Sequence, residues 1–222
     1  MGKQFLYFLF LPFILSGCLS STHYTPFLNK ETTRPVVAFV PVFDTSHSKL
    51  PWSLAQEFTT SMRERFLKSG ALHLLPEKEV SRLCEDLTDK NNPFHPKADW
   101  VKETFQGCEF VIFAEMLEHD IHPKSVSDTL LDRFVSSAEL SLSMRLRVFD
   151  LRTLKSSVIL QEIIHQDHTI PLPFDLSKEK GDYFSTITFK LSPLGFAHGD
   201  LTREVTARIE DYILLTQSTL KP

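Results

Sequence analysis

The sequence has no excess of basic residues: its 24 Lys and Arg are outnumbered by 28 Asp and Glu. Nucleic-acid binding depends on clustered positive charge, so this balance argues against a nucleic-acid partner. A CxxC pair, a phosphate-binding glycine loop, a Rossmann fingerprint, a nucleophile elbow and a zincin motif are all missing. We therefore expect a protein that is not an enzyme.

The sequence also has no apolar run long enough to cross a bilayer as a helix, which takes about 20 residues. The longest run is Phe5–Leu15, 11 residues that follow Lys3. A positive residue and then roughly 7–15 apolar ones are typical of a secretion signal. Residues 1–17 are therefore predicted to be a signal peptide.

The next four residues, Leu15-Ser16-Gly17-Cys18, resemble the bacterial lipobox. The resemblance implies cleavage between Gly17 and Cys18 and a lipid on the Cys18 thiol, with no other cofactor expected. Residue 19 is Leu rather than Asp, which by lipoprotein sorting rules implies the outer membrane, facing the periplasm or the surface. An ordinary signal peptide with an incidental cysteine is the alternative.

Residues 18–34 are polar and predict a short tether. The 16 residues after Cys18 span at most about 58 Å when fully extended. Residues 35–222 then form a single domain that works close to its membrane. Loss of the signal, with its Lys3, leaves 23 basic against 28 acidic side chains.

Two further cysteines, Cys84 and Cys108, leave two interpretations open. Cysteines of an exported protein often form a disulfide. Each also lies in an apolar stretch, where a free cysteine packs as a small hydrophobic residue.

The apolar periodicity predicts interleaved strands and helices followed by an antiparallel meander. Strands are expected at 36–43, 71–75, 109–117, 139–149, 157–168 and 183–191. Helices are expected after Ser53 as far as Gly70, after Pro76, at 97–106, and at 199–217 with Leu201, Val205, Ile209, Tyr212 and Ile213 on one side. The order predicts an α/β (α+β) sandwich with a mixed, largely antiparallel sheet of about 4–6 strands and helices packed on it.

Strict alternation in residues 139–149 is the clearest strand signal, with Leu140, Leu142, Met144, Leu146 and Val148 on one face. Both a sheet that covers helices and a membrane-spanning hairpin at 138–168 fit this pattern.

Histidines follow two strands that run the same way in such a meander: His119 and His122, then His165 and His168. Imidazole and carboxylate groups at one rim suit zinc. Solvated strand ends are the alternative, and the four residues alternate in facing.

The elements together resemble a known fold: an apolar strand ending in proline (36–43), an amphipathic helix, the segment Gly70–Glu77, a second helix and the strand 110–115. This is similar to the fold of the curli secretion lipoprotein CsgG, the penicillin-binding-protein activator LpoB and the N-terminal domain of TolB, and to a family of uncharacterised chlamydial envelope lipoproteins. Ala114 and Glu115 depart from the glycine usual in that fold, and the tether is shorter than an LpoB-type linker.

The resemblance and the anchor imply a non-catalytic binding or scaffold lipoprotein of the cell envelope that docks a protein partner. Candidate contacts are Phe94, Phe174 and Phe196. A subunit of an oligomeric secretion or envelope complex is the alternative.

Overall fold

The structure is a computed structural model that describes residues 34–85, 87, 91–96, 98–123, 137–171 and 181–219. Residues 34–222 form one compact unit. The predicted signal peptide, Cys18, the tether as far as residue 33, and Phe174 lie outside the described residues. No helix in the described part of the chain is both long and apolar enough to cross a membrane.

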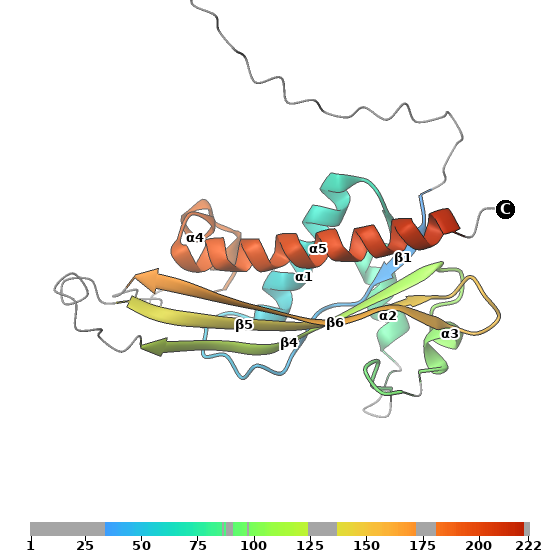
Figure 1. The fold of residues 1–222 in the computed structure, drawn as a ribbon, viewed down its shortest axis with the longest axis horizontal. Coiled ribbons are helices and arrows are strands. Elements are labelled where there is room, and N and C mark those ends of the chain that lie inside the picture. The colour runs from blue at the N-terminus through green and yellow to red at the C-terminus, as the bar shows by residue number, and fades with distance from the viewer. Residues whose placement is uncertain are drawn as a thin grey trace, which may run out of the picture. The chain divides into compact units, whose positions relative to one another are not determined.

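A six-stranded mixed sheet forms the centre of the unit, in the order β3-β1-β4-β5-β6, with β2 also pairing with β4 (Figure 1). The strands are β1 (Val36–Phe39), β2 (Phe43–Asp44), β3 (His73–Leu74), β4 (Phe110–Pro123), β5 (Ser137–Asp150) and β6 (Ser157–Pro171). The short strands β1, β2 and β3 pair in parallel, and the long strands β4, β5 and β6 pair antiparallel. The predicted fold class is confirmed.

Helices cover both faces of this sheet. They are α1 (Leu54–Ser69), α2 (Glu77–Cys84), α3 (Trp100–Thr104), α4 (Ile187–Lys190) and α5 (Pro193–Thr219), and a 3-10 turn, η1 (Tyr183–Ser185), precedes α4. Figure 1 shows α1, α4 and α5 on one side of the sheet and α2 and α3 on the other. Each face therefore has its own apolar core.

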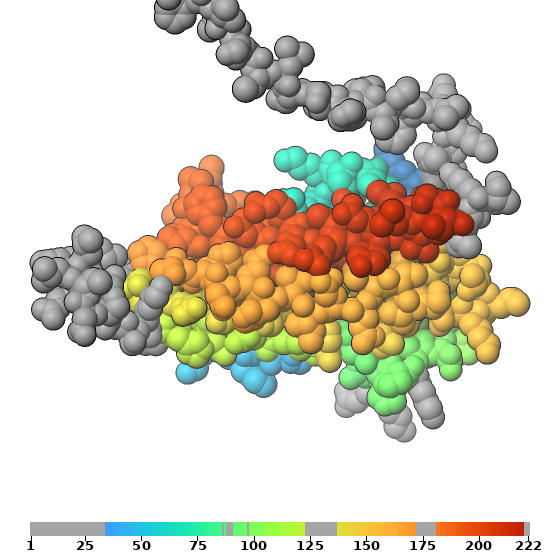
Figure 2. All heavy atoms as spheres, viewed as in Figure 1, coloured from blue at the N-terminus to red at the C-terminus, as the bar shows by residue number. Residues whose placement is uncertain are grey.

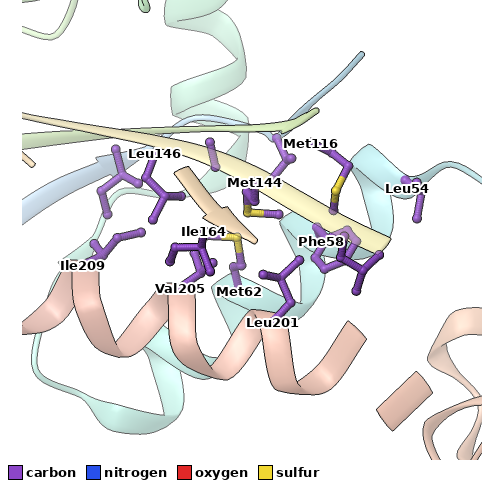
Figure 3. Packing of buried hydrophobic residues seen from close by; sticks show 14 of the residues in the cluster. Leu54, Phe58, Met62, Met116, Met144, Leu146, Ile164, Leu201, Val205 and Ile209 are labelled. Carbon is purple, nitrogen blue, oxygen red and sulfur yellow. The ribbon is translucent and has the colours of Figure 1, made fainter. Parts of the chain in front are cut away.

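The larger core lies between the sheet and helices α1 and α5 (Figure 3). The predicted stripe of α1, with Phe58 and Met62, points into it, and so do the five apolar residues of β5, all fully buried. The alternation in β5 thus comes from a sheet that covers helices. The smaller core joins Val80 of α2 and Val101 of α3 to the opposite face.

The ends of α1 follow from local chemistry. The Ser53 hydroxyl accepts a hydrogen bond from the Gln56 backbone N–H at 3.2 Å, which caps the first turn. Gly70 adopts φ 66°, a left-handed conformation that only glycine takes easily, and its N–H donates to the Phe66 carbonyl. Both predicted boundaries are confirmed.

The strand predicted at 183–191 is wrong, because this segment forms η1 and α4. Phe184 and Phe189 are buried while Ile187 and Leu191 are exposed, a spacing that does not alternate. The Thr186 hydroxyl accepts from the Phe189 N–H at 3.2 Å and starts a helical turn.

The last helix begins earlier than predicted, at Pro193, a residue well suited to a first helical turn. Leu201, Val205, Ile209 and Ile213 are buried as expected. Tyr212 is 43% exposed and was wrongly placed in the stripe, since the side chain one residue before Ile213 is rotated about 100° away from it.

Candidate functional site

A chain of polar side chains runs through the larger core, where apolar residues would be expected. Glu57 of α1, His198 of α5 and His119 of β4 are 2%, 2% and 4% exposed. His198 Nδ1 lies 2.6 Å from Glu57 Oε1, and the two imidazole Nε2 atoms are 3.0 Å apart. At the outer end, the half-buried Ser48 hydroxyl lies 3.0 Å from His119 Nδ1. This chain of four polar side chains links α1, α5 and β4 to the loop before α1.

Helix and strand geometry bring these groups together. Glu57 lies in the first turn of α1 beside Phe58, so the same turn that buries the phenylalanine also buries the carboxylate. His198 lies one turn before Leu201 on the buried side of α5. His119 follows a register shift in β4 between Met116 and Glu118, and it faces the helices. The chain therefore depends on tertiary packing of α1, α5 and β4.

Aromatic contacts enclose the same chain. The Trp52 indole N–H donates to Glu57 Oε2 at 2.7 Å. The ring of Phe189 packs 5.4 Å from Trp52 and 5.7 Å from His198, centre to centre. The buried carboxylate thus has a partner for each oxygen, and α4 is held against the site.

The contact between the two imidazoles limits their protonation. A hydrogen bond between the two Nε2 atoms needs one donor and one acceptor, so His119 and His198 cannot both be imidazolium. Burial, and then the proximity of His198, lower the pKa of His119 to about 4. His119 is therefore neutral at neutral pH.

A serine hydroxyl next to a histidine, as in the pair Ser48 and His119, also occurs in hydrolases. The residue before this serine, His47, has an unusual backbone conformation, with a positive φ of 55°. A general base works best when its pKa is near the working pH. A pKa of about 4 makes His119 a weak base at neutral pH. We interpret the chain of polar side chains as a buried connection between α1, α5 and β4.

The structure separates the four histidines that the sequence placed at one rim. His119 and His168 face the helices, while His165 and His122 belong to the opposite face. The described residues contain no group of three or more His, Cys, Asp or Glu side chains placed to hold a metal ion. The described rim therefore does not bring the four imidazoles together.

On the face away from α5, His165 has polar partners in its own sheet. Its Nδ1 lies 2.8 Å from the Ser143 hydroxyl, and its Nε2 lies 3.2 Å from Asp167 Oδ2. Ser143 donates in turn to Glu118 at 2.7 Å. On the α5 side, His168 pairs with Gln166 at 3.2 Å.

Sequence reasoning missed Glu57 and His198, the inner half of the buried chain. A signal existed: both are polar residues at helix positions whose neighbours on the same face are apolar. Helix α5 begins six residues before the predicted start at 199, so His198 was not recognised as part of its buried side.

Both internal cysteines border the smaller core, Cys108 within it and Cys84 packed against it. Both are free thiols in this structure. Burial raises the pKa of both, that of Cys108 to about 11, with the carboxylate of Glu79 as a second cause for Cys108. A disulfide between them stays a prediction.

The candidate contact residues differ in accessibility. Phe94 packs against the smaller core and lies under the Arg145 guanidinium, 4.2 Å from the ring centre to Cζ. Phe196 is 57% exposed, and Ile187 and Leu191 nearby are 74% and 64% exposed. We call these last three residues the α4 corner.

Comparison with known proteins places the chain in a family. Residues 25–217 match the model of a family of unknown function, DUF7499. The chain belongs to this family. No curated protein matches it.

One solved structure similar to this chain is that of the hypothetical protein CT253 from Chlamydia trachomatis. The two sequences are 29% identical and the TM-score is 0.58, and the match covers 82% of this chain and 98% of CT253. More remote are the lipoprotein GNA1162 from Neisseria meningitidis (14% identical, TM-score 0.40, covering 80% and 99%) and the LpoB C-terminal domain from Salmonella enterica (13%, 0.37, covering 60% and 82%). The expected likeness to a chlamydial protein is confirmed, while a likeness to CsgG or TolB stays a prediction.

Proposed function

We propose that this protein is a cell-envelope lipoprotein, anchored through a lipid on Cys18 to the outer membrane, that acts as a non-catalytic protein-binding module. The lipobox supports the anchor. The α4 corner supports the binding role, because it exposes three large apolar side chains, each more than half exposed, within ten residues of the chain.

The α4 corner is also held in place from inside. Phe189 of α4 packs between Trp52 and His198 of the core, while Ile187 and Leu191 on either side of it point to solvent. Such a buried anchor fixes the exposed side chains before a partner arrives, which lowers the entropic cost of binding.

The test is site-specific crosslinking in cells that make the full chain. A photoreactive amino acid at Phe196 is expected to give a discrete crosslinked product that mass spectrometry identifies as an envelope protein. The same residue at Leu154, which is 98% exposed at the turn between β5 and β6, is the matched control and should give none.

A second variant ties the product to the surface. Phe196→Glu should remove a partner crosslinked from Ile187, while thermal unfolding stays close to wild type, because substitution of an exposed side chain usually changes stability by less than about 0.5 kcal/mol. Absence of any product from both Phe196 and Ile187 would count against the proposal.

A further inference from the structure

Strand β6 forms one edge of the sheet. Among the described residues, its 15 residues pair only with β5. Figure 2 shows β6 along the visible face, below α5. An edge strand carries a row of backbone N–H and C=O groups that another extended chain can pair with.

The middle of this edge, Leu160–Ile170, lacks the features that usually prevent strand addition. It contains no Pro, Lys or Arg. The one register shift between β5 and β6 lies between Val148 and Phe149, towards the β5–β6 turn. Proteins usually block a long edge with a bulge, a proline or a lysine. This edge is regular from Leu160 to Ile170.

The two carboxylates of the edge already have partners within the chain. Glu162 pairs with Arg208 of α5. Asp167 accepts from the Ser141 hydroxyl at 2.7 Å and lies 3.2 Å from His165 Nε2. Neither group therefore brings an unpaired negative charge to an incoming strand.

Within Leu160–Ile170, one exposed residue is apolar. Ile163 is 58% exposed on the face away from α5, where its neighbours along the strand are Gln161 and His165. A β-branched apolar residue at mid-strand gains most from an apolar residue directly opposite on a neighbouring strand.

We propose that two copies of this chain associate by antiparallel pairing of their β6 strands, centred on Ile163. Two identical antiparallel strands are related by a two-fold axis, so one residue faces its own copy and the others pair symmetrically about it. Centred on Ile163, this register pairs Ile163 with itself, Gln161 with His165 and Glu162 with Ile164.

Neighbouring registers fit less well. A centre at Glu162 or Asp167 places identical carboxylates opposite each other, which is destabilising. A centre at Ile164 puts Ile163 opposite His165, and a centre at His165 puts it opposite Asp167. Among the centres from Glu162 to Asp167, only Ile163 gives the exposed isoleucine an apolar partner. A second copy supplies both that partner and an unpaired edge of its own, and this is why we infer a second copy as the occupant.

Cysteine crosslinking of the full chain, purified in mild detergent, tests both the interface and its register. Directly opposite residues of antiparallel strands have Cα atoms about 4.5–5.5 Å apart, which suits a disulfide. Ile163→Cys should give a disulfide-linked dimer under mild oxidation. Leu154→Cys, exposed but off the edge, and the wild-type chain with its native cysteines should stay unlinked.

Light scattering of the same preparations completes the test. Wild type is expected to be a dimer, and Ile163→Lys a monomer with wild-type thermal unfolding, because a lysine on an edge strand opposes pairing. A monomeric wild type overturns the proposal. A dimer that persists in Ile163→Lys also overturns it. The same holds if Leu154→Cys forms a disulfide-linked dimer and Ile163→Cys does not.

Discussion

His119 is a titratable group that the fold keeps neutral. Its imidazole is 4% exposed and lies against the ring of His198, whose other nitrogen contacts Glu57. Protonation of His119 would place a positive charge inside the core. At the scale of a single residue, the buried chain is thus a source of acid sensitivity.

The pKa of His119 sets the pH range of this effect. In the unfolded chain the imidazole takes up a proton near pH 6.5, whereas in the folded chain it does so only near pH 4. The unfolded state therefore binds more protons in this interval, and stability falls as the pH drops from 6.5 to 4. The full shift corresponds to at most about 3 kcal/mol.

Urea unfolding at a series of pH values measures this loss. His119→Gln keeps a polar side chain at the site without a titrating group and should flatten the dependence between pH 6.5 and 4. An unchanged slope in His119→Gln would refute the assignment.

At the scale of elements, helix α5 begins in close contact with α4. A Cβ atom at Gly195 would lie 2.0 Å from the Phe189 carbonyl oxygen, well inside any real contact. The Gly195 N–H donates to the Ser192 hydroxyl at 3.0 Å, which starts the helix at this point. Glycine is therefore required here for packing and not for an unusual backbone angle.

Two glycines of α5 offer a matched pair of substitutions. Gly195→Ala should displace α4 and destabilise the protein by about 1–3 kcal/mol, as expected for overpacking. Gly199→Ala meets no atom within 4 Å and should stabilise it by about 0.5–1 kcal/mol through helix propensity. Thermal unfolding of both variants measures the difference. Equal stability of Gly195→Ala and wild type would show that the α4–α5 contact yields easily.

At the scale of the whole molecule, the anchor would determine where the domain acts. In the predicted organisation the domain begins at residue 35. The 16 residues 19–34 separate it from the anchor residue, Cys18. If Cys18 carries the lipid, a tether of that length, at most about 58 Å when fully extended, would keep the domain near the membrane that holds the anchor. Any partner would then have to reach the same membrane.

Metabolic labelling with a fatty acid tests the anchor. Cys18→Ala should abolish the label and release the chain from the membrane fraction, because no other residue is expected to carry a lipid. Cys84→Ser changes a cysteine of the smaller core and should keep both the label and the membrane location. Label retained by Cys18→Ala would show that the lipobox interpretation is wrong.

Much of the fold was accessible from the sequence because its causes are local. Alternation in β5 reflects the two faces of a strand, and the Ser53 cap and Gly70 fix α1 through contacts within a few residues. The segment 183–191 failed because Thr186 starts a helical turn in a stretch whose apolar content suggested a strand. Local preferences compete there, and packing decides.

The sequence by itself determined the class of the fold, and it predicts an export signal and a lipobox at Cys18, since each of these is encoded by neighbouring residues. Only the tertiary structure decided the buried site. Glu57 and His198 are 141 residues apart in the chain, and His119 and His198 are 79 apart. Packing of α1 and α5 on one face of the sheet brings these groups together, and no pattern along the sequence records that distance.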